Sequence, residues 1–289
     1  DASASFAEFW EHPLARPVEE LLDPPTRHAP EAVWERMHQF ACNPSNFLPT
    51  LRARVNAVPT SLRTRVADGL MHAPSRVEYV SDAPGKNATG TLGGGGASTD
   101  ALIALVNQAS ESIVIQTPYL VTTERGEAVF RAAVERGVSV RILTNSRAAT
   151  DSLVAFSGYK RRRNGLLNAG VELYESKPQM AVQAELMNGP LEPRYRGSMA
   201  LHAKSMVIDR RIAVVGSFNL DPRSANLNTE SVTIIHSPEV AHRLLERMEQ
   251  EMSADNAWRR TATENPDKHS PLLRRFRVFL SGVVPVSVL

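Results

Sequence analysis

The chain has 289 residues, with 33 lysines and arginines against 31 aspartates and glutamates. This length suffices for one large domain or for a domain with an added arm. The nearly balanced charge argues against a protein whose main partner is nucleic acid. The single cysteine excludes an intramolecular disulfide and a cysteine-based zinc site. No apolar run reaches the roughly 20 residues that a membrane-spanning helix needs, and no secretory signal peptide is recognisable.

Residues 1–75 are predicted to form a helical, proline-rich arm. Five prolines lie within the first 30 residues, which argues against a compact sheet there. Apolar residues recur at helical spacing over 6–10, 31–40 and 61–70. We therefore expect the folded domain to occupy residues 76–289.

From Val77 onward the pattern changes to strands that alternate with helices. Strands are expected at 77–80, 113–115, 138–143 and 171–174, and helices from Thr99 or Asp100, over 124–136 up to Gly137, and over 150–168. This alternation predicts an α/β fold with a mixed, mainly parallel sheet flanked by helices. The glycine run 93–96 is interpreted as a connector rather than a phosphate cradle, because no Gly-Lys-Ser/Thr follows it.

A β-hairpin is predicted around a turn that begins at Asp209, because the runs on both sides are apolar and β-branched. Side chains two apart in a strand share a face, so His202 points the same way as Lys204, and Ser217 the same way as Asn219. One nucleophile, one cation and two neutral hydrogen-bonding groups suit a phosphoryl group. Asp209 lies an odd number of residues from His202, so we interpret it as a turn residue or ion-pair partner that fixes the hairpin.

This block resembles the HKD motif of the phospholipase D superfamily, His-x-Lys-(x)4-Asp followed by Gly-Ser-x-Asn. The run 219–230 extends the match and looks like the bacterial cardiolipin synthase-like branch. In that family the histidine attacks the phosphodiester and forms a phosphohistidine, the lysine, serine and asparagine hold phosphate oxygens, and a downstream glutamate orients the histidine. The resemblance therefore implies catalytic roles for His202, Lys204, Ser217, Asn219 and Glu230.

Other stretches look like the same branch, namely Asp82-x-Pro84-x-Lys86, 117–119, 136–146 and 166–175. The segment Phe6–Trp10 resembles the one that follows the first of two HKD motifs in such proteins. No second His-x-Lys-(x)4-Asp occurs in the sequence. The resemblance thus predicts a phospholipase D-like α/β sandwich that is the C-terminal half of a two-motif enzyme. The missing histidine would come from an N-terminal HKD half or from a second copy of the chain.

The function implied is phosphatidyl transfer that makes cardiolipin, with phosphatidylglycerol or phosphatidylethanolamine as candidate substrates and with no cofactor or metal. Tyr119 and Asn145, which follow strands, and Arg223 are candidate substrate-binding residues; Tyr119 and Asn145 can equally cap helices or fill turns. Three alternatives stay open: a phospholipase D-type hydrolase, a nuclease acting on nucleic acid, and a catalytically incomplete half that acts only with a partner chain.

Two basic stretches bear on membrane contact. The run 160–163 is either a solvated helix face or a contact for lipid phosphates or nucleic acid. Arginines border apolar residues over 274–284, which suits a helix in a membrane interface, or equally one packed on the domain. We expect a bacterial protein that is cytoplasmic or peripheral at the inner membrane.

Overall fold

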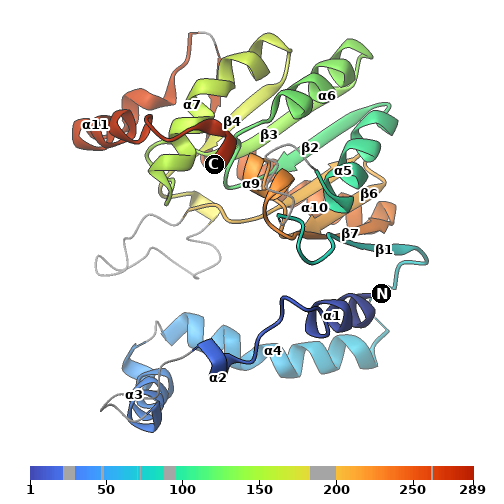
Figure 1. Cartoon of the computed structure of the whole chain (residues 1–289), viewed down its shortest axis with the longest axis vertical. Coiled ribbons are helices and arrows are strands. Elements are labelled where there is room, and N and C mark those ends of the chain that lie inside the picture. The colour runs from blue at the N-terminus through green and yellow to red at the C-terminus, as the bar shows by residue number, and fades with distance from the viewer. Residues whose placement is uncertain are drawn as a thin grey trace.

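A computed structural model describes residues 1–21, 30–46, 49–69, 71, 73–87, 95–182, 200–261 and 263–289. An eight-stranded sheet with the order β1-β7-β6-β5-β2-β3-β4-β8 forms the centre of an α/β domain, and the arm helices lie to one side of it (Figure 1). The strands are β1 (Val77–Ser81), β2 (Ser112–Gln116), β3 (Ser139–Asn145), β4 (Glu172–Ser176), β5 (Ser205–Ile208), β6 (Ile212–Gly216), β7 (Ser231–His236) and β8 (Ala257–Arg260).

The sheet is mixed, as the sequence predicts, but it is not mainly parallel. Only the β2–β3 and β3–β4 pairs are parallel, whereas the other five pairings among the described strands are antiparallel. The helical crossovers after β2 and β3 produce the parallel part. β5 then returns antiparallel beside β2 and continues through a tight hairpin into β6, so this half of the sheet is antiparallel. The prediction of a mainly parallel sheet was therefore wrong.

Helices cover both faces of the sheet. The helices of the domain are α5 (Ala97–Gln108), α6 (Glu124–Glu135), α7 (Leu153–Asn168), α9 (Pro222–Asn226), α10 (Pro238–Met252) and α11 (Leu272–Ser281), with short 3₁₀ turns η3 (Pro266–His269) and η4 (Val286–Val288). α5 begins two residues before Thr99, with Gly96 as its N-cap, and α7 begins at Leu153 behind a Ser152 cap. Both starts correct the sequence-based boundaries.

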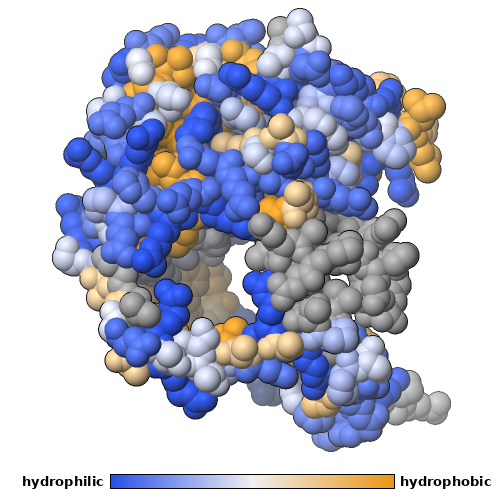
Figure 2. Space-filling model, turned by 180° about the vertical axis from the view of Figure 1, so that it is seen from behind, coloured by the Kyte–Doolittle hydropathy of each residue, from blue (hydrophilic) through white to orange (hydrophobic). Residues whose placement is uncertain are grey.

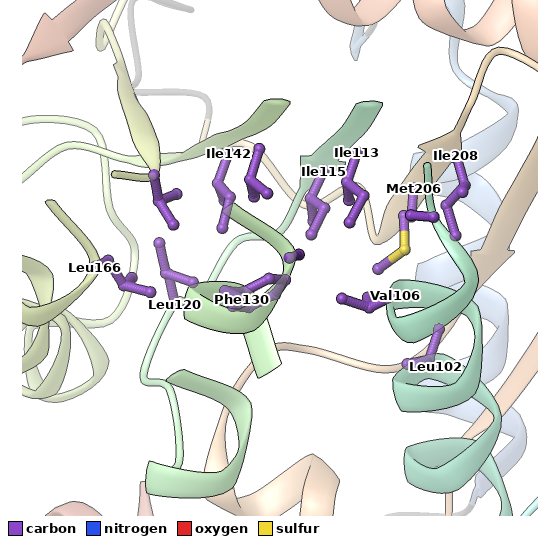
Figure 3. Close-up of a cluster of buried hydrophobic side chains, with 14 of the residues drawn as sticks. Leu102, Val106, Ile113, Ile115, Leu120, Phe130, Ile142, Leu166, Met206 and Ile208 are labelled. Carbon is purple, nitrogen blue, oxygen red and sulfur yellow. The ribbon is translucent and has the colours of Figure 1, made fainter. Parts of the chain in front are cut away.

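Alternation along the central strands divides the core between the two faces. On β2, Ile113 and Ile115 face α5 and α6, whereas Val114 faces α10. Met206 and Ile208 on β5 join the first cluster and Val207 joins the second. Figure 3 shows the first cluster, with the strand side chains directed at Val106 of α5 and Phe130 of α6. A sheet that is buried on both faces needs such continuous apolar runs.

The arm is helical, as expected. It comprises α1 (Ala2–Trp10), α2 (Val18–Leu21), α3 (Pro30–Cys42), η1 (Pro44–Asn46) and α4 (Pro49–Ala67). α4 starts well before the predicted 61–70 and contains Pro59. Trp10 and Trp34 are 73% and 69% exposed, so the apolar faces of the arm lack a covering partner among the described residues. Figure 2 shows an opening between part of the arm and the domain, whereas Phe9 and His12 at the N-terminal end of the arm line a cavity together with domain residues.

The two basic stretches are only partly solvated. Arg163 is buried, and its guanidinium makes ion pairs with Glu175 and Asp267, so the interpretation of 160–163 as a solvated face is wrong for this residue. α11 packs on α7 through the buried Val278 while Phe279 is 73% exposed. Among the described helices, none combines the length and apolar character that crossing a membrane demands.

Candidate active site

The hairpin places the four central residues of the motif at one end of the sheet. β5 begins at Ser205, so His202 and Lys204 lie in the extended segment just before it rather than inside a strand. Ser217 and Asn219 follow directly after β6. The pairing continues past the strand ends, because the Gly216 amide donates to the Lys204 carbonyl oxygen at 3.2 Å. The two segments therefore stay side by side where the chemistry is expected.

Gly216 explains the glycine of the Gly-Ser-x-Asn pattern. A Cβ added at this position would collide with the Ser231 carbonyl oxygen on β7. The neighbouring Ser217 amide donates to that same oxygen at 2.9 Å. The motif serine is thus held by β7, and only glycine allows the backbones to approach so closely.

Asp209 lies at the opposite end of the hairpin from His202. Asp209 and Arg210 have φ values of 49° and 56°, as the two central residues of a type I′ turn require. The Asp209 carboxylate accepts hydrogen bonds from the backbone of residues 110–112 and from the Ser110 hydroxyl. Burial alone would raise the pKa of Asp209, but these hydrogen bonds hold it below its usual value. Asp209 therefore ties the hairpin to the start of β2.

Lys204 supplies the positive charge of the site. Its Nζ donates to the His202 carbonyl oxygen at 3.1 Å, and the side chain is partly buried. Burial lowers the pKa of Lys204, while the carboxylates of Glu230, Asp221 and Asp151 act in the opposite direction. An ammonium that is poorly hydrated interacts more strongly with an incoming anion than one in bulk water.

Glu230 binds the motif serine rather than the histidine. Its carboxylate accepts hydrogen bonds from Ser217 Oγ at 2.5 Å, Ser224 Oγ at 2.8 Å and Asn228 Nδ2 at 3.3 Å. The hydrogen bond to His202 that the resemblance implies is not among the contacts of Glu230 in the structure. The positioning effect of Glu230 accordingly acts first on Ser217.

Asp82 and Lys86 lie beneath this network, and sequence analysis gave them no role. Asp82 is buried, and it accepts from Lys86 Nζ at 2.7 Å, from Ser98 Oγ at 2.7 Å and from the Glu230 amide at 3.0 Å. Lys86 Nζ also donates to the Ser224 carbonyl oxygen at 2.8 Å. The Asp82-x-Pro-x-Lys86 spacing was visible in the sequence, but it did not reveal that this pair fixes the backbone of Glu230.

An aromatic ring and a carboxylate border His202. The Tyr119 ring meets the imidazole edge-on, with centroids 6.5 Å apart, and the Tyr119 hydroxyl donates to Asp151 at 3.0 Å. Burial, together with the nearby Asp151 carboxylate, raises the pKa of Tyr119 to about 12. The phenol is therefore protonated at neutral pH and positioned beside an exposed imidazole. Asp151 was missed, because it follows no recognised motif.

Asn145 holds the segment that carries His202. Its side chain accepts from the Leu201 amide at 2.9 Å and donates to the Leu201 carbonyl oxygen at 2.9 Å and to that of Pro118 at 3.2 Å. Ser176 Oγ donates to the same amide oxygen. Because this buried side chain is saturated by protein groups, the structure places Asn145 as a clamp on the residue before His202 and gives substrate no free atom of it.

The remaining motif residues offer groups that protein atoms leave free. The Asn219 side-chain oxygen is buried and has no hydrogen-bond partner among the described residues. Arg223 is exposed on α9, and its charge acts on Asp221, the N-cap of that helix. Burial raises the pKa of Asp221 to about 6. An amide oxygen accepts hydrogen bonds, so a ligand hydroxyl can satisfy it, whereas the side-chain amide nitrogen of Asn219 and the ammonium of Lys204 can donate to phosphate oxygens.

Two hollows adjoin this set of side chains. An open cavity of about 670 Å³ is lined by Ser217, Glu230 and residues 227–229, and on its far side by Phe9 and His12 of the arm. A second cavity, of about 450 Å³, lies behind the loop 217–221 between α5 and α6. The candidate site therefore lies at an edge of the domain and adjoins two cavities.

The arrangement of these side chains agrees with the protein family that sequence comparison identifies. A family model described as "Cardiolipin synthase, PLD-like domain" matches residues 102–252, which is just over half of the chain. The chain belongs to this family of phospholipase D-like enzymes. It is 32% identical to Cardiolipin synthase C of Escherichia coli over 89% of this chain and 53% of the relative. It is 28% identical to Cardiolipin synthase 1 of Bacillus anthracis over 49% of this chain and 23% of the relative.

A solved structure shares the fold. The phosphatidylserine synthase of Haemophilus influenzae superposes with a TM-score of 0.50 at 14% sequence identity, over 74% of this chain and 48% of that chain. The present chain spans about half the length of E. coli Cardiolipin synthase C and less of the Bacillus relative.

Proposed function

We propose that this chain is the C-terminal half of a phosphatidyltransferase that makes cardiolipin through a phosphohistidine at His202. The observation that carries the proposal is the placement, at one end of the β5–β6 hairpin, of an exposed imidazole, a partly buried ammonium and the Asn219 side-chain amide, whose oxygen has no partner among the described residues. The names of the bacterial relatives, cardiolipin synthases, support a phospholipid as the substrate.

The first step is the attack of the His202 imidazole on the phosphorus of a phospholipid. A bond forms between nitrogen and phosphorus, the bond to the headgroup alcohol breaks, and that alcohol leaves with a proton from a second histidine. Lys204 and Asn219 stabilise the charge that develops on the phosphoryl oxygens. Ser217 donates to Glu230, so its oxygen has a fixed orientation before substrate arrives.

The second step transfers the phosphatidyl group to an acceptor. The second histidine now removes the proton from a hydroxyl of phosphatidylglycerol, whose oxygen attacks phosphorus and releases His202. Cardiolipin is the product when phosphatidylglycerol is the acceptor, and phosphatidic acid is the product when water is. The proposal commits to the lipid acceptor.

A second HKD half completes the site in this proposal. The sequence has one HKD block, and the side of the site formed by Ser217 and Glu230 opens toward a cavity of about 670 Å³. We infer that an N-terminal HKD half of the same protein, or a second copy, brings its histidine to this region. The substrates lie in a membrane, so the assembled enzyme is proposed to act at a membrane surface as a peripheral protein.

The test joins this chain to an N-terminal HKD half and supplies vesicles of headgroup-labelled phosphatidylglycerol. Cardiolipin and free glycerol should appear in equal amounts. His202→Asn should abolish both products, whereas His242→Asn, at an exposed histidine of α10, should leave them unchanged. Phosphatidic acid as the main product, or cardiolipin made equally well by the His202→Asn protein, would contradict the proposal. A steep loss of DNA binding with salt, without vesicle binding, would point to a nuclease instead.

A further inference from the structure

The cavity behind the catalytic loop is built for an apolar ligand. Its volume of about 450 Å³ lies within the range of small-molecule pockets, roughly 300–1,000 Å³. α5 contributes Leu102, Ile103 and Val106, and α6 contributes Val129 and Phe130. Figure 3 shows Leu102 and Val106 on one side, Phe130 on the other and Met206 of β5 beside them. The walls are therefore mainly hydrocarbon.

The cavity shares its wall with the phosphate site. Ser217 and Asn219 belong to the catalytic set, while the residue between them, Phe218, lines the cavity. Leu220 and Asp221, which follow in the same loop, line it as well. Lys204 borders a small hollow that has four wall residues in common with the cavity, Leu102, Met206, Phe218 and Leu220. A ligand whose phosphate sits at Lys204 thus has an apolar cavity one side chain away.

One polar group in the wall lacks a partner. Thr122 is 3% exposed and lines the cavity, and its hydroxyl has no hydrogen-bond partner among the described residues. A buried donor of this kind carries a desolvation cost that a ligand acceptor can remove. Thr122 follows a segment that runs beside the catalytic loop, since the Val121 amide donates to the Leu220 carbonyl oxygen at 2.8 Å. The hydroxyl is therefore near the end of the cavity that adjoins the site.

We propose that this cavity binds one acyl chain of the phospholipid substrate and that the Thr122 hydroxyl donates to the ester carbonyl of that chain. The inference rests on the proposed function for the phospholipid headgroup, but binding of the acyl chain can be measured without turnover. Hydrocarbon walls match the chain, the free hydroxyl matches the ester, and the shared loop 217–221 places the ester between cavity and phosphate.

The test measures binding by calorimetry with single-chain lysophosphatidylglycerols below their micelle concentrations, using His202→Asn protein so that no chemistry occurs. Shortening a dodecanoyl chain by two carbons should weaken binding on the order of tenfold. Ile103→Trp should fill the cavity and weaken dodecanoyl binding by a similar factor. Val66→Trp, at a 59% exposed position of the arm, is the matched control and should bind normally.

The ester contact is tested with a dodecyl ether analogue that lacks the carbonyl. Thr122→Val should weaken binding of the ester roughly three- to tenfold and leave binding of the ether unchanged. Equal effects on both lipids would overturn the Thr122 assignment. Binding without chain-length dependence, or unaltered by Ile103→Trp, would overturn the acyl cavity.

The test does not depend on whether Ile103→Trp folds, because a fatty acid with a terminal diazirine probes the cavity of the chain without this substitution. Light should attach it to the cavity segments of α5 and α6, and attachment elsewhere alone would contradict the proposal. Failure of phosphohistidine formation with intact chain binding would instead reject the proposed function and leave the cavity assignment standing.

Discussion

Two polar clusters of the domain differ in burial and in ion pairing. Each holds one buried carboxylate or amide oxygen without a hydrogen-bond partner among the described residues, Glu175 Oε2 in the first and Asn219 Oδ1 in the second. In the buried cluster, Arg163 makes ion pairs with Asp267 at 2.6 Å and Glu175 at 3.3 Å, and the Tyr159 hydroxyl donates to Glu175 at 3.0 Å. In the candidate catalytic cluster, His202 is exposed and the Asn219 amide oxygen has no partner among the described residues. A cluster whose charges pair with one another stabilises a fold, whereas one with free groups is available to a ligand.

Removal of a charge should therefore have opposite consequences in the two clusters. Arg163→Met removes the cation that pairs with both Asp267 and Glu175 and leaves Asp267 with the longer contact to Arg147 at 3.8 Å, so it should lower the free energy of unfolding by about 3–5 kcal/mol. Urea denaturation measures this. Arg131→Met is the matched control, because Arg131 is 52% exposed and pairs with Glu127 one helical turn away. A loss from Arg163→Met no greater than that of Arg131→Met would show that the buried cluster is not structural.

Lys204→Met tests the other side of the comparison. Burial already lowers the pKa of Lys204, so loss of the ammonium should change the free energy of unfolding by no more than about 0.5 kcal/mol. The rate of phosphatidyl transfer should fall by about 10²–10³-fold, since a donor to the transition-state oxygens is gone. Unfolding and product assays on the same preparation separate the two effects. A destabilised but fully active variant would reverse the assignment.

Asp221 connects the stability of the candidate catalytic cluster to pH. Burial raises its pKa to about 6 from an ordinary 3.8, so folding favours the protonated form. This contribution is fully present below about pH 4 and is lost as the pH rises through 6. Asp221→Asn stays neutral and still caps α9, so it should be more stable than the native protein by up to about 3 kcal/mol at pH 8 and equal to it at pH 4. A pH-independent difference would refute the assignment.

Asp209 should show the smallest effect of the four. Asp209→Ala removes the acceptor for four hydrogen bonds at the start of β2 and should cost about 1–3 kcal/mol, measured by thermal unfolding. The pKa of Asp209 is lowered, so its contribution is present above the unfolded pKa and is lost as the pH falls through the folded one. Asp209→Asn keeps a residue that tolerates positive φ and should lose less. An unchanged melting temperature for Asp209→Ala would mean that the carboxylate does not hold the start of β2.

The sequence predicted the elements of the domain better than the arrangement of the sheet. Apolar runs and stop signals such as Gly137, with φ 86°, located β1 to β6, α6 and α7 to within a few residues, whereas β7, β8 and α10 were not predicted. Strand direction was not encoded in those runs, because a buried antiparallel strand such as β5 reads like a parallel one. The start of α5 was predicted two residues too late. The Ser98 amide in its first turn donates to the side chain of Asp82, which lies 16 positions away in sequence, and no local pattern shows such a cap.

The motif residues were predicted, but several of their supports were not. The spacing of His202, Lys204, Ser217 and Asn219 placed them at one end of a hairpin, and their catalytic roles stay a prediction. The clamp from Asn145 to Leu201 and the hold of Asp82 on Glu230 involve residues 56 and 148 positions apart. No local pattern reports such contacts, because tertiary packing alone brings the partners together.

The most direct measurement of the central claim is the location of the covalent phosphate. The chain, joined to its N-terminal HKD half, would be mixed with phosphatidylglycerol, quenched within milliseconds and digested under alkaline conditions for mass spectrometry. The account predicts a phosphatidyl group on His202, absent from the Lys204→Met protein or strongly reduced in it. Turnover with an adduct only on another residue, or with none at all, would contradict the account.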